Sequence, residues 1–182
     1  MTEPSPSAPS SIIAAGLPDS ARVWTYASDR ELTKPEENRL LDILNAFCSS
    51  WRSHGRPVES SAAVIERRFA VLIGRIVDGD VSGCGIDASV HALEEASAEL
   101  GIAWLPALVV HYRDRHGAIC SVPRSAFREH VRAGEVDADT HVFDLGIQSL
   151  GQLRSGQFEQ PAGRTWHAHV FRLTNAAYDG AG

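Results

Sequence analysis

The chain has 182 residues, and its 17 Lys and Arg against 23 Asp and Glu give a net charge of −6. Such an acidic chain is a poor ligand for phosphate backbones, so no nucleic-acid partner is expected. No apolar run reaches the roughly 18 residues that span a bilayer, and the N-terminus lacks a signal-peptide pattern. Cys48, Cys84 and Cys120 are too widely spaced for a disulfide framework or a zinc knuckle. These features predict a cytoplasmic protein that crosses no membrane.

The two ends of the chain are predicted to be poorly ordered. Residues 1–20 are rich in Pro and Ser and bury too little apolar area to offset their ordering entropy, so we expect a flexible leader. Its apolar island of Ile12, Ile13 and Leu17 is a candidate docking peptide for a protein partner. Residues 174–182 are rich in Ala and Gly and predict a frayed tail.

The first folded region is predicted over residues 21–113 and opens with a strand and a helix. Residues 22–28 are enriched in β-branched and aromatic side chains, which is typical of a strand. Thr33 and Glu36 then form a capping box ahead of apolar residues at helical spacing. Gly55 is the expected end of this helix.

The following elements complete a ferredoxin-like arrangement. Residues 58–65 and 69–77 are strand-like and too close for anything but a tight turn, so they predict a hairpin. A second amphipathic helix is predicted over 88–100, ended by Gly101, and a fourth strand over 105–112. The order strand, helix, strand, strand, helix, strand predicts an α+β fold with a ferredoxin-like βαββαβ core, in which two helices cover one face of an antiparallel sheet.

A small α+β appendage packed on this core is predicted over residues 114–173. A DRHG turn folds the fourth strand back onto residues 118–122, and a short helix follows over 123–134. Further strands are expected at 140–144 and 165–173. The region between these two strands is rich in Gly and Gln and shows no clear pattern.

The most unusual local sequence is the Gly-rich loop expected just before the second helix. Its glycines allow close approach of a partner, and the helix end would direct free N–H groups and a positive dipole into the loop. An anion or a thiolate would be stabilised there. The loop is therefore a candidate ligand-binding site formed by Ser82, Gly83, Gly85 and Asp87.

Cys84 lies within this loop and has two interpretations. As a thiolate, it would be a nucleophile or a redox thiol, with His54 or His167 as the base. In the structural alternative, Asp87 is the N-cap of the helix and Cys84 is a small buried hydrophobic residue.

Two tryptophans have alternative interpretations, and a third has one. Trp51 lies on the apolar stripe of the first helix and is expected in the core. Trp24 and Trp166 are candidates for the partner surface, because aromatic side chains line grooves that hold ligands or peptides. Core packing is the alternative for both.

The histidines do not predict a metal centre. His167 and His169 alternate on a predicted strand, and His111, His116 and Cys120 lie close together around a predicted turn. Neither set has the number and spacing of ligands that a closed site requires. No metal or other cofactor is therefore expected.

Several standard catalytic motifs are absent from the sequence. It contains no G-x-x-x-x-G-K-[ST] loop, no G-x-G-x-x-G after a strand, no G-x-S-x-G, no H-E-x-x-H and no C-x-x-C. Without the first of these motifs, the phosphates of ATP have no recognisable cradle, so an ATPase is not expected.

Short motifs along the chain form a specific combination, namely Arg22-Val23-Trp24 with Tyr26 and Ser28, Trp51 with His54-Gly55, Arg68-Phe69, Ser82-Gly83-Cys84-Gly85-Ile86-Asp87, Thr140 with Val142-Phe143, and Trp166-His167. In these motifs the chain resembles an uncharacterised bacterial protein family, whose members often carry the label "ABC transporter ATPase". The resemblance covers residues 22–171. Gly85 departs from the family pattern SGCSID, and the missing hydroxyl argues against a catalytic role for this position. The label itself conflicts with the absent phosphate-binding loop.

Residues 127–143 show a second likeness. Their short helix, Gly134 and the run from Asp139 to Phe143 look similar to part of the GYF-type peptide-binding modules, although the aromatic signature of those modules is incomplete. The resemblance implies a protein-interaction unit behind the first domain.

Two classes of function follow. In the first, the chain is a non-enzymatic binding or accessory protein that docks on a larger protein assembly. In the second, it is a thiol-dependent enzyme or redox sensor that acts through Cys84. The absence of a dithiol partner and of an acid/base constellation favours the first. A smaller third alternative is an anionic metabolite that binds the loop and regulates docking.

Overall fold

The computed structural model describes residues 13–77, 79 and 81–173. The predictions for the start of the leader, which include Ile12, and for the tail at 174–182 lie outside the described residues. The chain combines helices with antiparallel sheets, so the α+β class is confirmed. It divides into two compact units. Unit 1 comprises residues 1–105 and 146–155, and unit 2 comprises residues 106–145 and 156–182.

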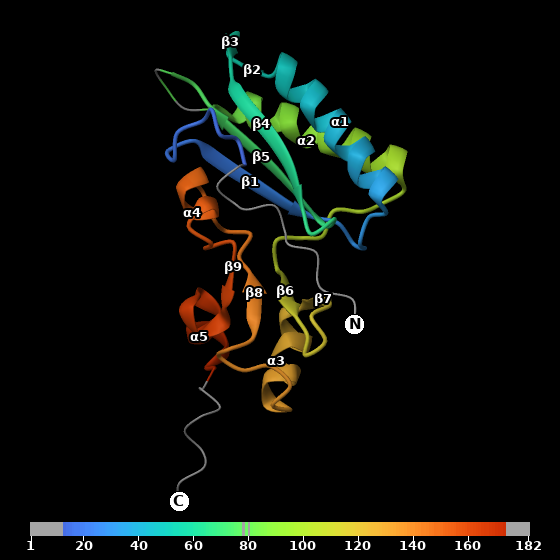
Figure 1. The fold of residues 1–182 in the computed structure, drawn as a ribbon, viewed down its shortest axis with the longest axis vertical. Coiled ribbons are helices and arrows are strands. Elements are labelled where there is room, and N and C mark those ends of the chain that lie inside the picture. The colour runs from blue at the N-terminus through green and yellow to red at the C-terminus, as the bar shows by residue number, and fades with distance from the viewer. Residues whose placement is uncertain (1–12, 78, 80, 174–182) are drawn as a thin grey trace, which may run out of the picture. The chain divides into compact units, whose positions relative to one another are not determined.

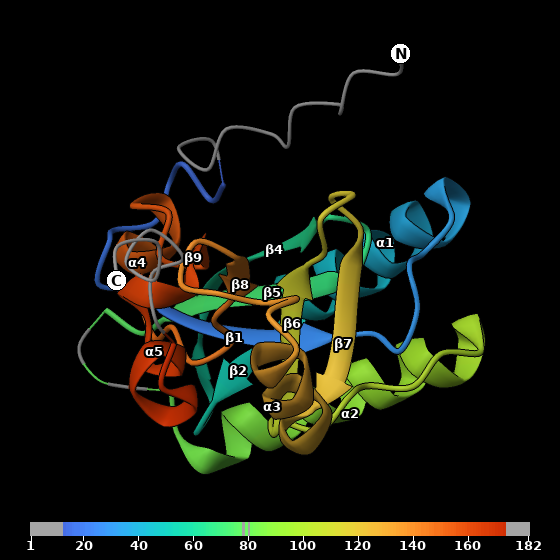
Figure 2. The same ribbon diagram turned by 90° about the horizontal axis from the view of Figure 1, so that it is seen from below.

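Unit 1 is a three-stranded antiparallel sheet with two long helices, and its strands follow the order β1-β5-β4 (Figures 1 and 2). The predicted first strand, first helix and hairpin are all present. The elements of this unit are β1 (Arg22–Ala27), α1 (Lys34–Ser50), β2 (Arg52–Ser53), β3 (Arg56–Pro57), β4 (Glu59–Ile65), β5 (Phe69–Arg75), α2 (Gly83–Leu100) and α4 (Leu150–Arg154).

The predicted capping box starts α1, but the helix ends earlier than expected. Thr33 accepts a hydrogen bond from the backbone N–H of Glu36, whose carboxylate in turn accepts from the backbone N–H of Thr33. Hydrogen bonds from Arg30 and then from Thr33 hold the pKa of Glu36 at about 2. The helix ends at Ser50 instead of Gly55. Gly55, with a φ of +76°, lies in the tight turn between β2 and β3.

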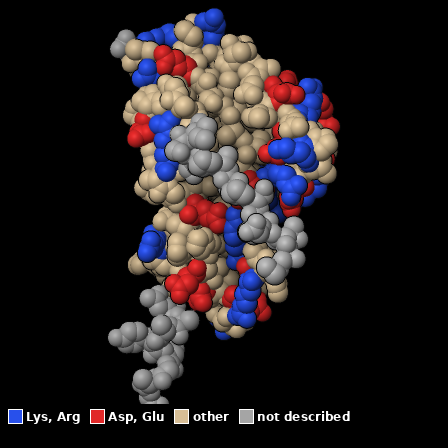
Figure 3. All heavy atoms as spheres, viewed as in Figure 1, with Lys and Arg blue, Asp and Glu red and all other residues tan. Residues whose placement is uncertain are grey.

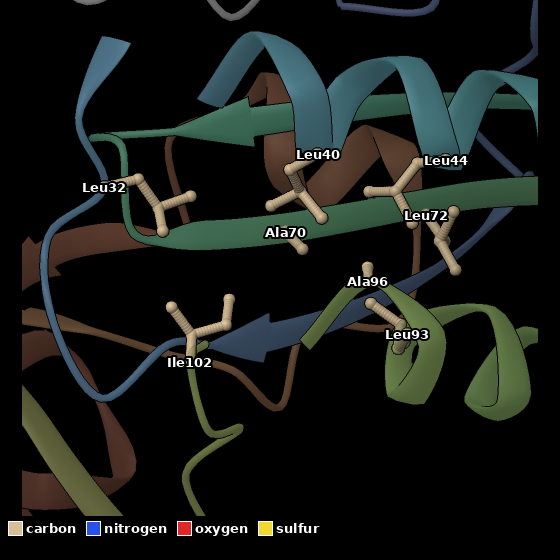
Figure 4. Close-up of a cluster of buried hydrophobic side chains, with 8 residues drawn as sticks. All are labelled: Leu32, Leu40, Leu44, Ala70, Leu72, Leu93, Ala96 and Ile102. Atoms are coloured by element: carbon tan, nitrogen blue, oxygen red, sulfur yellow. The ribbon is translucent and has the colours of Figure 1, made fainter. Parts of the chain in front are cut away.

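The core of unit 1 lies between its sheet and its two long helices. Leucines of α1 and α2 converge on β5, while loop residues close one end of the cluster (Figure 4). Each of these side chains is at most 8% exposed: Leu32, Leu40, Leu44, Ala70, Leu72, Leu93, Ala96 and Ile102. Helical spacing on α1 and strand alternation on β5 thus supply matching apolar faces.

The ferredoxin-like core is not confirmed, because the fourth strand lies elsewhere. The strand expected at 105–112 is β6 (Val109–Arg113), and it pairs with β7 (Ile119–Pro123) and β8 (His141–Phe143) in the sheet of unit 2. The domain boundary expected after residue 113 therefore falls at residue 105. Leu105 still bonds to β1, with its N–H donating to the carbonyl of Ala27 at 2.8 Å. The chain turns away after this contact instead of continuing as a central strand.

Unit 2 is a four-stranded antiparallel sheet in the order β7-β6-β8-β9. Besides β6, β7 and β8, it contains α3 (Arg124–Arg132), β9 (Glu159–Pro161), a 3-10 helix (Ala162–Arg164) and α5 (Trp166–Phe171). Its buried cluster consists of Val110, Tyr112, Phe127, Val136, Val142, Ala162 and Phe171. Burial raises the pKa of Tyr112 to about 12.

The strand predicted over 165–173 is wrong, because α5 occupies this segment. Thr165 caps the helix by accepting from the backbone N–H of His167. His167 and Phe171 are both buried, and their spacing of four residues places them on one helical face. The alternation of apolar and polar residues in this stretch was compatible with either structure, and tertiary burial selects the helical one.

The described part of the predicted leader is held by α4 within unit 1. Arg154 donates to the Asp19 carboxylate at 2.6 Å and to the carbonyls of Ile13 and Ala14 at 3.3 and 2.8 Å. Ile13 and Leu17 are half-buried. These two residues of the candidate docking peptide thus belong to a segment that the chain itself binds.

Candidate functional site

The residues predicted as a Gly-rich loop form the first turns of α2. The helix begins at Gly83 with Ser82 as its N-cap, five residues before the predicted start at Ala88. Asp87 is therefore an exposed residue inside the helix and not its N-cap, which corrects the structural alternative for this segment. Periodicity missed this start because two glycines and a cysteine carry little apolar signal.

Gly85 explains why α2 can start so close to the β2–β3 turn. The Nε1–H of Trp51 donates to the carbonyl of Gly85 at 2.9 Å. A Cβ atom at Gly85 would lie 2.9 Å from a methyl of Val81 and 3.0 Å from the Cβ of Ser53. Gly85 is buried and serves close packing, so it is not part of an open ligand-binding loop.

A pair of serines joins the start of α2 to β2. The hydroxyls of Ser53 and Ser82 lie 2.6 Å apart, and the backbone N–H of Ser82 donates to Ser53 Oγ at 3.0 Å. Ser82 makes no side-chain capping bond to the helix. Its hydroxyl is used for this tertiary contact instead.

Cys84 is exposed at the second residue of α2, which rules out the buried-cysteine alternative. Cys48 and Cys120 are half-buried, and burial raises the pKa of the Cys48 thiol. Within the described ranges, Cys84 has no hydrogen-bond partner. Its accessibility and its place at the positive end of an 18-residue helix are compatible with a reactive thiol.

The two candidate bases for Cys84 lie in different environments. His54 is exposed in the β2–β3 turn of unit 1, one residue from the Ser53 that contacts Ser82. No hydrogen bond between His54 and Cys84 occurs in the part of the chain that the structure describes. His167 belongs to unit 2, so the structure does not bring it together with Cys84 in one unit.

His167 is packed as a neutral core residue. It is 1% exposed, its Nδ1 lies 2.7 Å from the Thr165 hydroxyl, and its ring stacks on Trp166 with centroids 3.7 Å apart. Burial lowers the pKa of His167 to about 4. A histidine so withdrawn from solvent is a poor general base for an exposed thiol.

The two candidate surface tryptophans differ. Trp24 packs against the core clusters of unit 1, and its ring meets that of Trp51 edge to face, with the ring centroids 5.5 Å apart. Trp24 is therefore a core residue. Trp166 is 39% exposed, and the guanidinium of Arg124 lies 5.0 Å from its ring centroid. His167 stacks on the Trp166 ring, so only the remaining exposed part of that ring could contact a partner. Trp166 therefore stays a candidate for the partner surface.

Unit 1 contains a groove between α1 and α2, with a volume of about 830 Å³. Its floor is apolar and its rim is charged. The residues that line it are Arg39, Asp42, Ile43, Ala46, Phe47, Ser50, Trp51, Arg52, Ala88, His91, Ala92, Glu95 and Glu99. Cys84 precedes Ala88 by four residues, so it continues the α2 face of the groove by one turn.

Sequence reasoning did not identify this groove. The feature of the sequence that could have revealed the groove is a pair of small residues, Ala46 and Ala88, on the two amphipathic helices that border it. Arg39 and Glu99 close one end of the groove through an ion pair with a shortest N–O distance of 2.5 Å. Only the packing of α1 beside α2 turns these scattered positions into one surface (Figure 1).

A second hollow, of about 630 Å³, lies in unit 2 among several acidic residues. Its carboxylates serve the local structure. Asp114 accepts from the backbone N–H groups of His116 and Ala118, and Glu159 pairs with Arg113. Across the described residues, no three His, Cys, Asp or Glu side chains are arranged to hold a metal ion.

Comparison with protein families, characterised proteins and solved structures finds no match to this chain. Both resemblances noted in the sequence therefore stay predictions. None of the described helices has the length and apolar character needed to cross a membrane.

Proposed function

We propose that the chain is a non-enzymatic accessory protein that docks on a protein partner through the groove between α1 and α2. The observation that carries this proposal is the groove itself, which combines an apolar floor with a charged rim in a volume of about 830 Å³. This size falls within the range of about 300–1,000 Å³ that is typical of binding pockets.

The floor provides the affinity. Ile43 and Phe47 are half-buried, Ala46 is exposed, and together they leave apolar atoms open to water along α1. Covering such atoms contributes about 25 cal/mol for each Å² removed from water. An amphipathic helix with apolar residues on one face fits a channel between two helices in this way.

The rim selects the charge of the partner. Arg39 pairs with Glu99 at one end and also attracts Asp42, which is exposed one turn further along α1. Glu95 is exposed and has no hydrogen bond or ion pair with described residues. Lys or Arg side chains beside the partner's apolar residues would meet these carboxylates. The net charge of −6 also attracts a basic partner over longer distances. We therefore assign the groove to a basic amphipathic helix.

The first prediction tests this assignment by charge reversal. Two fluorescent synthetic helices of about 16 residues, four to five turns, would share an apolar stripe and carry either Lys or Glu beside it. The native chain should bind the Lys peptide more tightly in an anisotropy titration. Asp42→Lys/Glu95→Lys should weaken that binding about tenfold and favour the Glu peptide, because each rim pair contributes up to about 1 kcal/mol.

Two matched controls separate the groove from the general charge of the surface. Glu94→Lys reverses one charge next to Glu95 and should leave the preference unchanged when compared with Glu95→Lys alone, since Glu94 does not line the groove. Ala46→Trp should fill the groove and abolish binding, whereas Asn45→Trp, at the neighbouring exposed position, should not. Equal affinity for both peptides, or full binding by Ala46→Trp, would contradict the proposal.

A second candidate function is thiol chemistry at Cys84. It is supported by the exposure of Cys84 on the second residue of α2, where the hydroxyl of Ser82 does not cap the helix N–H groups. Free N–H groups and the helix dipole both stabilise a thiolate. On this alternative, Cys84 would be a nucleophile or a redox sensor beside the groove.

The second prediction concerns alkylation of this thiol. In Cys48→Ala/Cys120→Ala protein, a reactive Cys84 should be alkylated at neutral pH at least about tenfold faster than a small free thiol under the same conditions. Protein that also carries Cys84→Ala measures the background. Labelling no faster than that of the free thiol would contradict the thiol alternative and leave the accessory role.

A further inference from the structure

Two arginines of α3 stack on aromatic rings of α5 in unit 2. The guanidinium of Arg124 lies 5.0 Å from the centroid of the Trp166 ring, and that of Arg128 lies 5.7 Å from the centroid of the Phe171 ring. The two helices lie side by side (Figures 1 and 2), and the rings of Phe127 and Phe171 join them with centroids 4.7 Å apart. Each arginine is thus held against the neighbouring helix by a cation–π contact.

Neither of these two arginines has a carboxylate partner among the described residues. Both are exposed, and neither forms a hydrogen bond or an ion pair there. Glu129, the acidic residue of α3, pairs instead with Arg132. Asp144 accepts a hydrogen bond from the Nε1–H of Trp166 at 3.3 Å. On the face of unit 2 that Figure 3 shows, by contrast, basic and acidic side chains lie close to one another.

Stacking leaves the hydrogen-bonding edge of a guanidinium free. A ring covers one face of the planar group, while the five N–H donors point outwards in its plane. These donors match the two oxygens of a carboxylate, which they bind as a bidentate pair. The ring also restricts the side chain, so less rotamer entropy is lost when an anion binds. Arg124 and Arg128 therefore present two oriented sites for carboxylates.

The spacing of the two arginines fits an extended peptide. Residues four apart on a helix have Cβ atoms about 6 Å apart. In an extended chain, residues i and i+2 point to the same side and lie about 6.7 Å apart, because each residue advances the chain by about 3.3 Å. Two acidic residues with one residue between them can therefore reach Arg124 and Arg128 at the same time.

The same surface offers apolar contacts on α5. Trp166 is 39% exposed and Val170 is 42% exposed, and their spacing of four residues places them on one face of the helix. An apolar side chain beside the acidic residues of a peptide would cover part of both. Removing this apolar area from water adds affinity that charge alone does not supply.

We propose that this α3–α5 surface, defined by Arg124, Arg128, Trp166 and Val170, binds an extended acidic segment of a protein partner. The segment carries two Asp or Glu residues separated by one residue, with an apolar side chain next to them. The net charge of −6 repels such a segment at long range, so recognition depends on these short-range contacts. The proposal is independent of the groove in unit 1, whose proposed ligand is a basic helix, and either can fail without the other.

The test compares two fluorescent peptides of about ten residues in anisotropy titrations with the full chain. One contains Glu-Leu-Glu-Leu between polar flanks, and the other has Gln in place of each Glu. The Glu peptide should bind at least about tenfold more tightly, and added salt should weaken its binding because ion pairs are screened.

Substitutions on α3 assign this difference to the two arginines. Arg124→Gln and Arg128→Gln should each weaken binding of the Glu peptide about three- to fivefold, and together they should remove its advantage over the Gln peptide. Arg124→Lys/Arg128→Lys should keep only part of the advantage, because lysine has the charge without the planar fork. Arg115→Gln removes the same charge as either single variant from the exposed β6–β7 turn and should leave the affinity unchanged.

Nuclear magnetic resonance locates the peptide on the native chain and needs no substitution. Adding the Glu peptide to ¹⁵N-labelled protein should shift the indole N–H signal of Trp166 and the amide signals of α3 and α5, whereas those of α1 and α2 should not move. Equal affinity for the two peptides, unchanged binding by the double Gln variant, or shifts confined to other elements would overturn the proposal. So would a single-stranded oligonucleotide that binds this surface more tightly than the Glu peptide. Binding that occurs only after removal of residues 174–182 would also overturn it, since those residues would then be the occupant.

Discussion

His167 shows how packing decides the chemistry of a single residue. As a sequence feature it was a candidate base, because histidine is the side chain most suited to proton transfer near neutral pH. In the fold it is buried between Trp166 and Phe171, and burial lowers its pKa to about 4. The same residue thus becomes a source of pH-dependent stability in unit 2.

The third prediction follows from this lowered pKa. In the unfolded chain His167 takes up its proton near the ordinary value of about 6.5, whereas in the folded chain it does so only near pH 4. The unfolded state therefore binds more protons between these values, and the stability that His167 contributes, complete above pH 6.5, is lost as the pH falls towards 4.

Urea titrations at several pH values, followed by tryptophan fluorescence and by exchange of unit 2 amides, measure this loss. His167→Gln should lower the stability at pH 7 and flatten its decline between pH 6.5 and 4.5. Glu36, whose pKa is about 2, contributes its own decline below pH 4.5, in unit 1. An unchanged slope in His167→Gln would show that other groups cause the acid sensitivity.

Among the elements, α2 shows where local patterns fail. The capping box of α1 and the hairpin of β4 and β5 were predictable because their signals lie within a few residues. The start of α2 depends on tertiary contacts, because only a residue without a side chain fits at position 85, close to Trp51 and Ser53. The spacing of apolar residues along the sequence contains no information about such a contact.

The fourth prediction compares the same substitution at two glycines of α2. Gly85→Ser, which restores the serine of the resembled family pattern, should destabilise unit 1 by about 1–3 kcal/mol, because its Cβ would crowd Val81 and Ser53. Gly83→Ser should change the stability by less than about 0.5 kcal/mol, since that position faces open space. Equal midpoints in chemical denaturation would contradict the close packing described for Gly85.

On the scale of the whole molecule, unit 1 is built from two separate stretches of chain. Residues 146–155 return to it after forty residues of unit 2. In this stretch, Leu150 is fully buried and its N–H donates to the carbonyl of Ala21 at 2.9 Å. The sequence showed only a weak pattern beyond Leu145, so neither α4 nor this return was predicted.

The fifth prediction uses this return. Leu150→Ala should destabilise unit 1 by about 2–5 kcal/mol, as is typical for a buried leucine. Hydrogen exchange should become faster in β1 and β5, although both are more than seventy residues away in sequence. Leu108→Ala, which alters a leucine that is 64% exposed, is the control and should change stability by less than about 0.5 kcal/mol. Unchanged exchange in β1 and β5 would contradict the membership of Leu150 in unit 1.

The sequence by itself determined the α+β class and the elements whose caps, turns and periodicities are local, namely β1, α1, β4, β5 and α3. Tertiary structure alone decided that β6 leaves the first sheet, that residues 166–171 are helical, and that His167 lies in a different unit from Cys84. Tertiary structure alone also formed the groove between α1 and α2 and placed β4 at the edge of its sheet. The physical reason is that hydrogen-bonded turns and helix caps form between neighbours, whereas strand partners and burial depend on contacts between distant residues.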